Sequence, residues 1–338
     1  MSDISSTRFG KAVGLSRRAF LKSVPRAALA ASCIRVPYRR DDFVLPDRSP
    51  VVLLPASSYD VDLADTIGRG LEMLRVPVGG RRVLLKPNFV EYESGGAINT
   101  HPHVVAAAAT AFLKAGAREV VVGEGTGHRR DVEYLLAGTG LSDVLKDLRL
   151  RFVDLNHDDV RQVPLKSRYT KLDSLWLPDA LLESDIVVSM PKLKTHHWAG
   201  MTASMKNLFG VVPGAVYGWP KNLLHFRGIE QSIIDLTATV KPALTIVDAV
   251  VAMEGDGPIM GRPRAMGFLG MGIDLVAADA TCARIIGLDP AKMPYLSVAS
   301  RFLGNIDERK IDQLGESLAR YRTQFDVVEP SRRFRLTA

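Results

Sequence analysis

The amino-acid sequence predicts an α/β protein with a mostly parallel sheet flanked by helices, built as one large domain or as two joined Rossmann-like lobes. Short β-branched runs alternate with helix-sized segments, which is typical of βαβ units. The runs at residues 120–122, 186–188 and 244–247 are apolar throughout, as expected of parallel strands buried on both faces. Polar residues follow directly after several runs, where open α/β sheets bind their ligands.

Hydrophobic periodicity gives the elements in chain order. Helices are expected where apolar residues recur at a spacing of three to four, and strands where β-branched residues run together. The predicted strands cover residues 51–55, 82–85, 119–122, 151–155, 185–189 and 244–247. The predicted helices cover residues 62–74, 104–115, 131–147, 228–240 and 276–286.

The N-terminal segment is predicted to be an export leader. Residues 16–22 have the sequence S-R-R-A-F-L-K, and an alanine-rich apolar run follows at residues 27–34. Paired arginines before a short apolar run resemble the bacterial twin-arginine signal. We therefore expect residues 1–45 to be the leader and linker, residues 46–330 to be the α/β domain, and the protein to be exported to the periplasm or another extracytoplasmic space.

Two cysteines set further expectations. Cys33 lies in a weak lipoprotein-like sequence, which leaves a lipid anchor open beside simple cleavage or no cleavage, and Cys282 is the other cysteine. A single cysteine outside the leader excludes a disulfide scaffold and a cysteine-ligated iron–sulfur cluster in the domain. No apolar stretch reaches the roughly 20 residues of a membrane span, so no such span is expected.

The net charge of +7 comes from the leader rather than from the domain. Residues 1–40 hold nine Arg or Lys and one Asp, a net charge of +8, which leaves −1 for residues 41–338. Proteins that follow a phosphate backbone usually carry a basic stripe on the folded domain. A nucleic-acid partner is therefore not expected.

The most informative stretch is residues 190–214, which interleaves lysines and histidines with apolar residues. An interleaved pattern predicts a partly enclosed loop, and enclosed lysines need an anionic partner or a lowered pKa. The pattern indicates either a small anionic ligand or an amine nucleophile activated by desolvation. The residues expected to bind the ligand are Lys86, Asn88, Glu124, Lys192, Lys194 and Asn207, with His196 and Lys206 as catalytic residues. His196 is expected to be the general acid/base, with a pKa near neutrality.

An acidic segment lies beyond the strand at residues 244–247. Asp248 is followed by Glu254 and Asp256 in the sequence E-G-D-G-P, which is typical of a flexible turn. Carboxylate oxygens at this spacing are candidate ligands for a divalent cation. The sequence leaves a cation site and an ordinary turn equally open.

Four motifs together resemble the family called domain of unknown function 362. They are K-P-N at residues 86–88, P-K-L-K-T-H at 191–196, K-N-L-F-G at 206–210 and E-G-D-G-P at 254–258. Twin-arginine leaders also occur in that family. The resemblance implies membership over roughly residues 80 to 290, and it implies no particular activity.

The segment from His196 to Lys206, with Pro213-Gly214 beyond it, is similar to a segment of the nickel-pincer lactate racemases. In those enzymes the lysine carries the pincer cofactor and a histidine performs proton or hydride chemistry. Ala203-Ser204-Met205 stand where those enzymes have Gly-Gly before the lysine. The resemblance implies the fold and the location of the site.

Taken together, these features favour an exported enzyme that performs acid/base or metal-assisted chemistry on a small anionic molecule. Two alternatives stay open on the sequence. One is a non-catalytic envelope protein that binds a small acid or a metal. The other is a metal-dependent phosphate-ester hydrolase, which would need a divalent cation held by Asp256.

Overall fold

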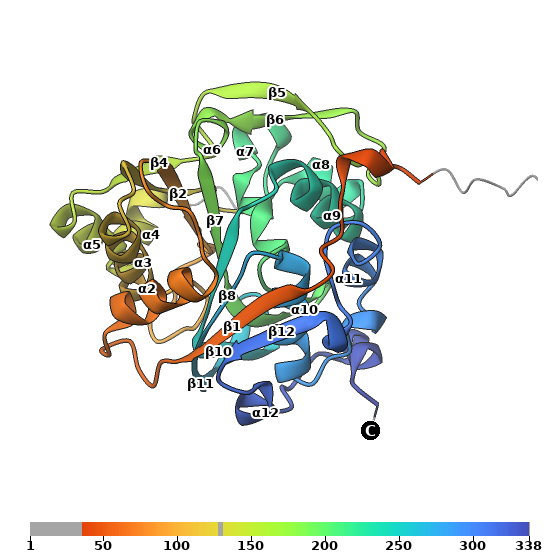
Figure 1. Ribbon diagram of the computed structural model, residues 1–338. Helices are drawn as coiled ribbons and strands as arrows, with labels where there is room; N and C mark the ends of the chain where they lie inside the picture. Colours follow the sequence, from red (N-terminus) through yellow and green to blue (C-terminus); the bar gives the residue numbers. More distant parts are fainter. Residues whose placement is uncertain (1–35, 128–130, 338) are drawn as a thin grey trace, which may run out of the picture. The chain divides into compact units, whose positions relative to one another are not determined.

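A central ten-stranded sheet organises the protein. The computed structural model describes residues 36–127 and 131–337, and from Pro37 onward the chain forms one compact unit (Figure 1). The main path of the sheet has the order β12-β1-β11-β10-β7-β2-β3-β4, with β8 beside β10 and β9 beside β8. The strands are β1 (Ser49–Pro55), β2 (Arg82–Pro87), β3 (Glu119–Glu124), β4 (Arg151–Asp154), β7 (Ile186–Met190), β8 (Lys192–His196), β9 (Gly200–Thr202), β10 (Leu244–Asp256), β11 (Met260–Gly272) and β12 (Ile311–Gly315).

Most neighbours in this sheet are parallel. Strands β4, β3, β2, β7 and β10 run in one direction, and β8 pairs with β10 in that direction as well. Only β11 and β9 pair antiparallel with their neighbours. The predicted fold class, a mostly parallel sheet flanked by helices, is confirmed.

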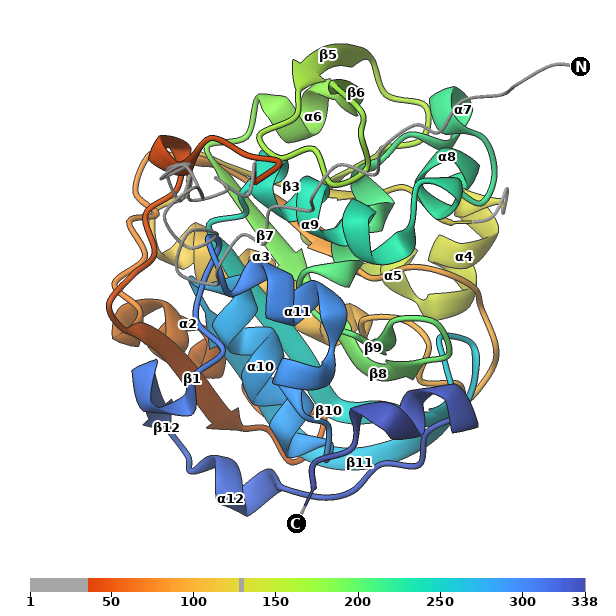
Figure 2. The same ribbon diagram turned by 90° about the vertical axis from the view of Figure 1, so that its right-hand side faces the viewer.

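Helices cover both faces of the sheet. Helices α2 to α5 lie on one side and α9 to α11 on the other, as the two views show (Figures 1 and 2). The helices are α2 (Leu63–Met73), α3 (Pro102–Lys114), α4 (Val132–Thr139), α5 (Leu141–Asp147), α6 (Asp179–Leu182), α7 (Gly214–Tyr217), α8 (Asn222–Phe226), α9 (Ile229–Val240), α10 (Leu275–Ile285), α11 (Pro294–Ala299) and α12 (Leu318–Tyr321). Short 3₁₀ helices are η1 (Arg40–Asp42), η2 (Lys206–Val211), η3 (Pro290–Lys292), η4 (Glu308–Lys310) and η5 (Glu329–Phe334).

Alternation along the strands creates two cores. In β2, Val83 and Leu85 pack into the core beneath α2 and α3, while Leu84 packs into the core on the opposite face. All three are fully buried, which explains why the parallel strands have uninterrupted apolar sequences. The same alternation turns the next even-numbered residue, Lys86, toward the face of Leu84. A lysine is thereby directed into the protein interior.

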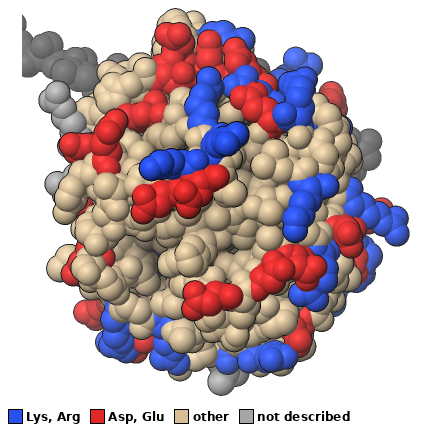
Figure 3. Space-filling view, turned by 90° about the vertical axis from the view of Figure 1, so that its left-hand side faces the viewer, with Lys and Arg blue, Asp and Glu red and all other residues tan. Residues whose placement is uncertain are grey.

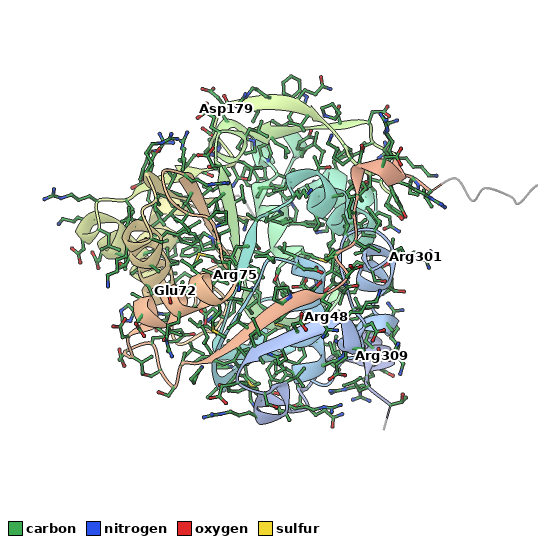
Figure 4. The ribbon with its side chains drawn as sticks, in the orientation of Figure 1. Arg48, Glu72, Arg75, Asp179, Arg301 and Arg309 are labelled. Carbon is green, nitrogen blue, oxygen red and sulfur yellow. The ribbon has the colours of Figure 1, made fainter. Side chains whose placement is uncertain are left out.

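At the edge of the sheet, Arg48 before β1 contacts β12 and the residues that precede it. The Arg48 guanidinium donates to the Asp312 carboxylate at 2.7 Å and to the backbone oxygen of Arg309 at 3.1 Å. Arg48 and Arg309 are labelled at this edge in Figure 4. Both side chains are accessible to solvent, so the contact contributes little to stability.

Several strands were not predicted. Residues 192–196 were expected to be a loop, and they form β8. The predicted strand 244–247 extends to Asp256 and pairs with β11, so the expected flexible acidic turn is the end of a long hairpin. Strand β11 contains four glycines and one proline in thirteen residues, so strand propensity does not predict it. The small β5–β6 pair (Val160–Pro164, Ser174–Pro178) was also missed.

Charged side chains of both signs are interspersed on the face shown in Figure 3.

In the described ranges, no helix has the length and apolarity that a membrane crossing requires. The predicted twin-arginine segment, residues 16–22, and Cys33 lie outside the described residues.

Candidate functional site

A cavity of about 390 Å³ lies where β2, β3 and β8 end. Ligands of open α/β sheets bind at this edge, and the volume suits a small molecule. Most of the predicted site residues line it: Asn88, Glu124, Lys194, His196, Lys206, Asn207 and Asp256.

Lys86 and Glu124 form a buried ion pair beneath the cavity. Both are almost fully inaccessible, and the Lys86 ammonium donates to Glu124, to Asn207 Oδ1 at 3.0 Å and to the backbone oxygen of Pro87 at 2.8 Å. Burial lowers the pKa of Lys86 and raises the pKa of Glu124, while their mutual attraction opposes both shifts. Lys86 is therefore neutralised within the protein and is not a free ligand contact, in contrast to its predicted role.

The backbone of η2 packs closely against the Lys86–Glu124 ion pair. Asn207 Nδ2 donates to the Lys86 carbonyl and to Ser189 Oγ, both at 3.1 Å, which fixes η2 against β2 and β7. A Cβ on Gly210 would collide with the Glu124 carboxylate, so the close approach of η2 requires glycine there. The predicted residues Lys86, Glu124 and Asn207 are brought together by these contacts.

Two further lysines beside the cavity have fixed acceptors. Lys194 Nζ donates to the backbone oxygen of Ile98 at 2.7 Å, and Lys221 Nζ donates to Asn156 Oδ1 and to the Val212 carbonyl. Both side chains are buried. Burial, followed by the charge of Lys206, lowers the pKa of Lys194 well below its usual value, and burial lowers the pKa of Lys221 to about 7.

Lys206 differs from the other three lysines. Its side chain is partly exposed and lines the cavity, with Nζ 4.1 Å from the centre of the Phe209 ring. Within residues 36–127 and 131–337, no hydrogen-bond acceptor or carboxylate contacts it. Burial, with a further contribution from the charge of Lys86, lowers the pKa of Lys206 to about 8, and the Glu124 carboxylate opposes this shift. A cation in a cavity with no carboxylate in direct contact is placed to meet an anionic ligand.

His196 is held in one tautomer by the backbone. Its Nδ1 accepts the backbone N–H groups of Trp198 at 3.1 Å and Ala199 at 3.2 Å, so the ring hydrogen lies on Nε2. Burial and the charge of Lys206 lower the pKa of His196 well below its usual value. The expected pKa near neutrality is wrong, because burial and neighbouring cations disfavour the imidazolium. At neutral pH His196 is an N–H donor.

Asn88 completes the polar groups of the cavity. Its side chain is 8% exposed, and Oδ1 has no hydrogen-bond partner among the described residues. Much of the remaining wall is apolar, including Phe89, Phe209 and Ile259. A buried acceptor without a donor among the described residues indicates a ligand that carries a hydrogen-bond donor as well as an anionic group.

Lys192 and Asp248 lie outside this cavity. The Lys192 ammonium contacts the Asp248 carboxylate at 2.6 Å and Tyr59 Oη at 2.8 Å, and Tyr59 stacks on His101. Lys192, Tyr59 and His101 line a second cavity of about 390 Å³. Three acceptors surround the Lys192 ammonium, so all of its hydrogen-bond donors have partners within the protein. Lys192 therefore has a structural role. Lys192 and Asp248 are separated from the other predicted site residues.

The three predicted cation ligands do not come together. Asp248 pairs with Lys192, and Glu254 is held by Arg262 at 3.1 Å and Arg264 at 3.3 Å. Only Asp256 lines the first cavity, with its carboxylate 3.7 Å from His197 Nδ1. In the described part of the chain, no group of three His, Cys, Asp or Glu side chains is placed to hold a metal ion. The geometry therefore provides no metal centre built from these carboxylates.

Sequence reasoning missed Lys221 and the supporting role of Asp279. Lys221 follows a Trp-Pro pair in an irregular segment, and no pattern in the sequence connects it to the cavity. Asp279 lies on α10, and its carboxylate accepts the backbone N–H groups of Ser204 at 2.7 Å and Met205 at 3.1 Å. It thereby anchors the backbone immediately before Lys206. The only signal was a carboxylate on the buried face of a predicted helix.

The Asp279 contact gives a pH-dependent prediction. Burial raises the pKa of Asp279 to about 7, so the native protein keeps a proton that the unfolded chain loses near pH 4. The contribution of Asp279 to the free energy of unfolding should therefore fall as the pH rises from about 4 to about 7. Urea unfolding of the wild type and of Asp279→Asn at several pH values measures it. The wild type should lose stability relative to the variant across this range, and a difference that does not change with pH would contradict the assignment.

The sequence matches a protein family and a relative of known sequence. Residues 83–284 match the family model described as "Domain of unknown function (DUF362)". A thylakoid-associated protein of Synechocystis sp. is 32% identical over 270 residues, which cover 74% of this chain and 78% of that protein.

Two solved structures are more distant. Lactate racemase apoprotein from Thermoanaerobacterium thermosaccharolyticum is 14% identical with a TM-score of 0.41, and the match covers 66% of this chain and 56% of that chain. A protein from Thermotoga maritima is 14% identical with a TM-score of 0.36, covering 65% and 58%. The family match extends over more than half of the sequence and includes the cavity residues from Asn88 to Met260. The chain belongs to the DUF362 family.

Proposed function

We propose that this protein is an enzyme that binds a small carboxylic acid in the first cavity and moves a proton on it. The observation that carries the proposal is the Lys206 ammonium, which lines the cavity and has no hydrogen-bond acceptor or carboxylate in direct contact among the described residues. One accessible cation in a largely apolar wall suits a monoanion with an apolar body better than a phosphate ester. The separated carboxylates also give a metal-dependent phosphate-ester hydrolase no support.

Each polar group of the cavity has a role in this chemistry. The Lys206 ammonium attracts the carboxylate, and its pKa of about 8 leaves part of the amine neutral and able to accept a proton at neutral pH. The Nε2–H group of His196 donates to the ligand oxygen that gains negative charge when a neighbouring proton leaves. Asn88 Oδ1 can accept a hydrogen bond from a hydroxyl group of the acid.

The lysines around Lys206 support this role. The charge of Lys86 makes the ammonium form of Lys206 less favourable, and the Glu124 carboxylate offsets part of this effect. The twin-arginine leader would deliver the folded enzyme to an extracytoplasmic compartment, and the thylakoid-associated relative is compatible with a protein that works at or beyond a membrane.

Solvent deuterium exchange tests the proposal. The purified protein is incubated in D₂O with small 2-hydroxy and 2-oxo acids, and the loss of C–H proton signals is followed by NMR. We expect exchange with at least one acid, and at subsaturating acid the rate should rise with pH up to about 8, because the neutral amine of the free enzyme is the active form. Tight binding without exchange on any acid would instead identify a non-catalytic binding protein.

A further inference from the structure

Lys206 is the one lysine beside the cavity that has the geometry of a reactive amine. Lys86, Lys194 and Lys221 are at most 1% exposed and donate to fixed acceptors. Lys206 begins η2, is partly exposed, and contacts the Phe209 ring without accepting or donating a hydrogen bond in the described ranges. Its Nζ is therefore free to approach a bound molecule.

The local structure holds this amine in place. The Asp279 carboxylate holds the backbone of the two residues before Lys206. The residue after Lys206 is Asn207, whose side chain donates hydrogen bonds to β2 and β7. The backbone on both sides of Lys206 is thus anchored to the sheet or to α10. A nucleophile carried on an anchored backbone loses little entropy when it reacts.

The charge environment favours the neutral amine. Burial and the positive charge of Lys86 lower the pKa of Lys206 from 10.5 to about 8. At pH 7 this raises the neutral fraction by roughly two orders of magnitude over an ordinary lysine. Desolvation beside another cation is an established way to activate a lysine for attack on carbonyl carbon.

We propose that Lys206 is a nucleophile that forms an imine with a small 2-oxo acid. This inference rests on the proposed function, and it names the substrate class and the covalent step. A 2-oxo acid carries a carboxylate that the Lys206 ammonium attracts and, next to it, the carbonyl carbon that the neutral amine attacks.

The covalent step balances without a further reactant. The neutral Nζ of Lys206 forms a bond to the carbonyl carbon while the C=O π electrons move to the oxygen, and one Nζ proton is transferred to that oxygen to give a carbinolamine. The second Nζ proton is transferred to the hydroxyl group, which leaves as water while the C=N bond forms. Amine and 2-oxo acid thus give imine and one water molecule, with no change of oxidation state. The His196 Nε2–H group is the donor available to the oxygen during attack.

Reductive trapping tests this inference. The full-length protein is incubated with pyruvate and sodium cyanoborohydride near pH 7, digested, and mapped by mass spectrometry. We expect a Lys206 peptide heavier by the mass of pyruvic acid less one oxygen atom. Lys146, an exposed lysine on α5, is the internal reference, and labelling at Lys206 should exceed it by at least about tenfold, given the difference in neutral fraction.

Variants separate the outcomes. Lys206→Arg should abolish the adduct and should keep binding of propionate, which has a carboxylate but no carbonyl. Lys146→Arg should leave labelling of Lys206 unchanged. Equal labelling of Lys206 and Lys146 would overturn the imine, even if solvent exchange on other acids upheld the proposed function. Labelling of Lys206 without exchange on any acid would keep the imine and overturn the proton transfer.

Discussion

Lys206→Met is expected to weaken the binding of pyruvate by about 10- to 100-fold, because a charge-assisted contact in a desolvated site is worth about 1.5 to 3 kcal/mol. The side chain of methionine has nearly the same length and shape, so the cavity should keep its form. Removing a charge that has no counter-ion in the described protein should leave the free energy of unfolding unchanged or raise it. Isothermal titration calorimetry and urea unfolding measure the two quantities.

A matched control distinguishes a local effect from a general one. Lys146→Met removes the same charge from an exposed helix, and it should leave pyruvate binding unchanged. If Lys206→Met binds pyruvate as tightly as the wild type, the cavity is not the anion site. If both variants weaken binding equally, the effect of Lys206 is only that of net charge.

Glu124→Gln is expected to destabilise the protein by about 3 to 5 kcal/mol, because it leaves the Lys86 ammonium buried without its counter-ion. Lys86→Met should cost a similar amount by leaving the Glu124 carboxylate unpaired. Removing both charges in Lys86→Met/Glu124→Gln should recover much of the loss, since no buried charge then lacks a partner. Urea unfolding of the four proteins gives the coupling energy.

The coupling energy shows whether Lys86 and Glu124 stabilise the fold as a pair or act independently. A large favourable coupling, with the double variant more stable than either single variant, supports a buried pair that serves the fold of the cavity floor. Additive losses in the double variant would contradict it, because Lys86 and Glu124 would then act independently. Gly210 lies against both side chains, so the residues that replace Lys86 and Glu124 should be no larger than the native ones.

The fold could be predicted from the sequence where burial leaves a simple pattern. Parallel strands buried on both faces produce apolar runs such as residues 120–122 and 186–188, and these became β3 and β7. Strand β11 could not be predicted in this way, because it alternates glycine with large residues and pairs through backbone contacts. The tertiary pairing with β1 and β10 stabilises it, and that pairing has no local signature.

The site could be predicted in its location but not in its charges. Residues at the ends of β2, β3 and β8 do meet at one edge, as parallel strands require. Which lysines are neutralised depends on contacts across long separations, such as Lys86 with Glu124 and Lys192 with Asp248. The sequence cannot show that, of the described lysines beside the cavity, Lys206 is the one without a hydrogen-bond acceptor. The low pKa of His196 likewise follows from burial that only the fold reveals.

The state of the Lys206 amine is the most direct test of the whole account. Lysine labelled with ¹⁵N at Nζ, assigned with Lys206→Arg, reports its titration by NMR in the free protein and with saturating propionate. We expect a pKa of about 8 in the free protein and a higher pKa with propionate, because the bound carboxylate favours the ammonium. A Lys206 that titrates like a solvent-exposed lysine and does not respond to propionate would contradict the account.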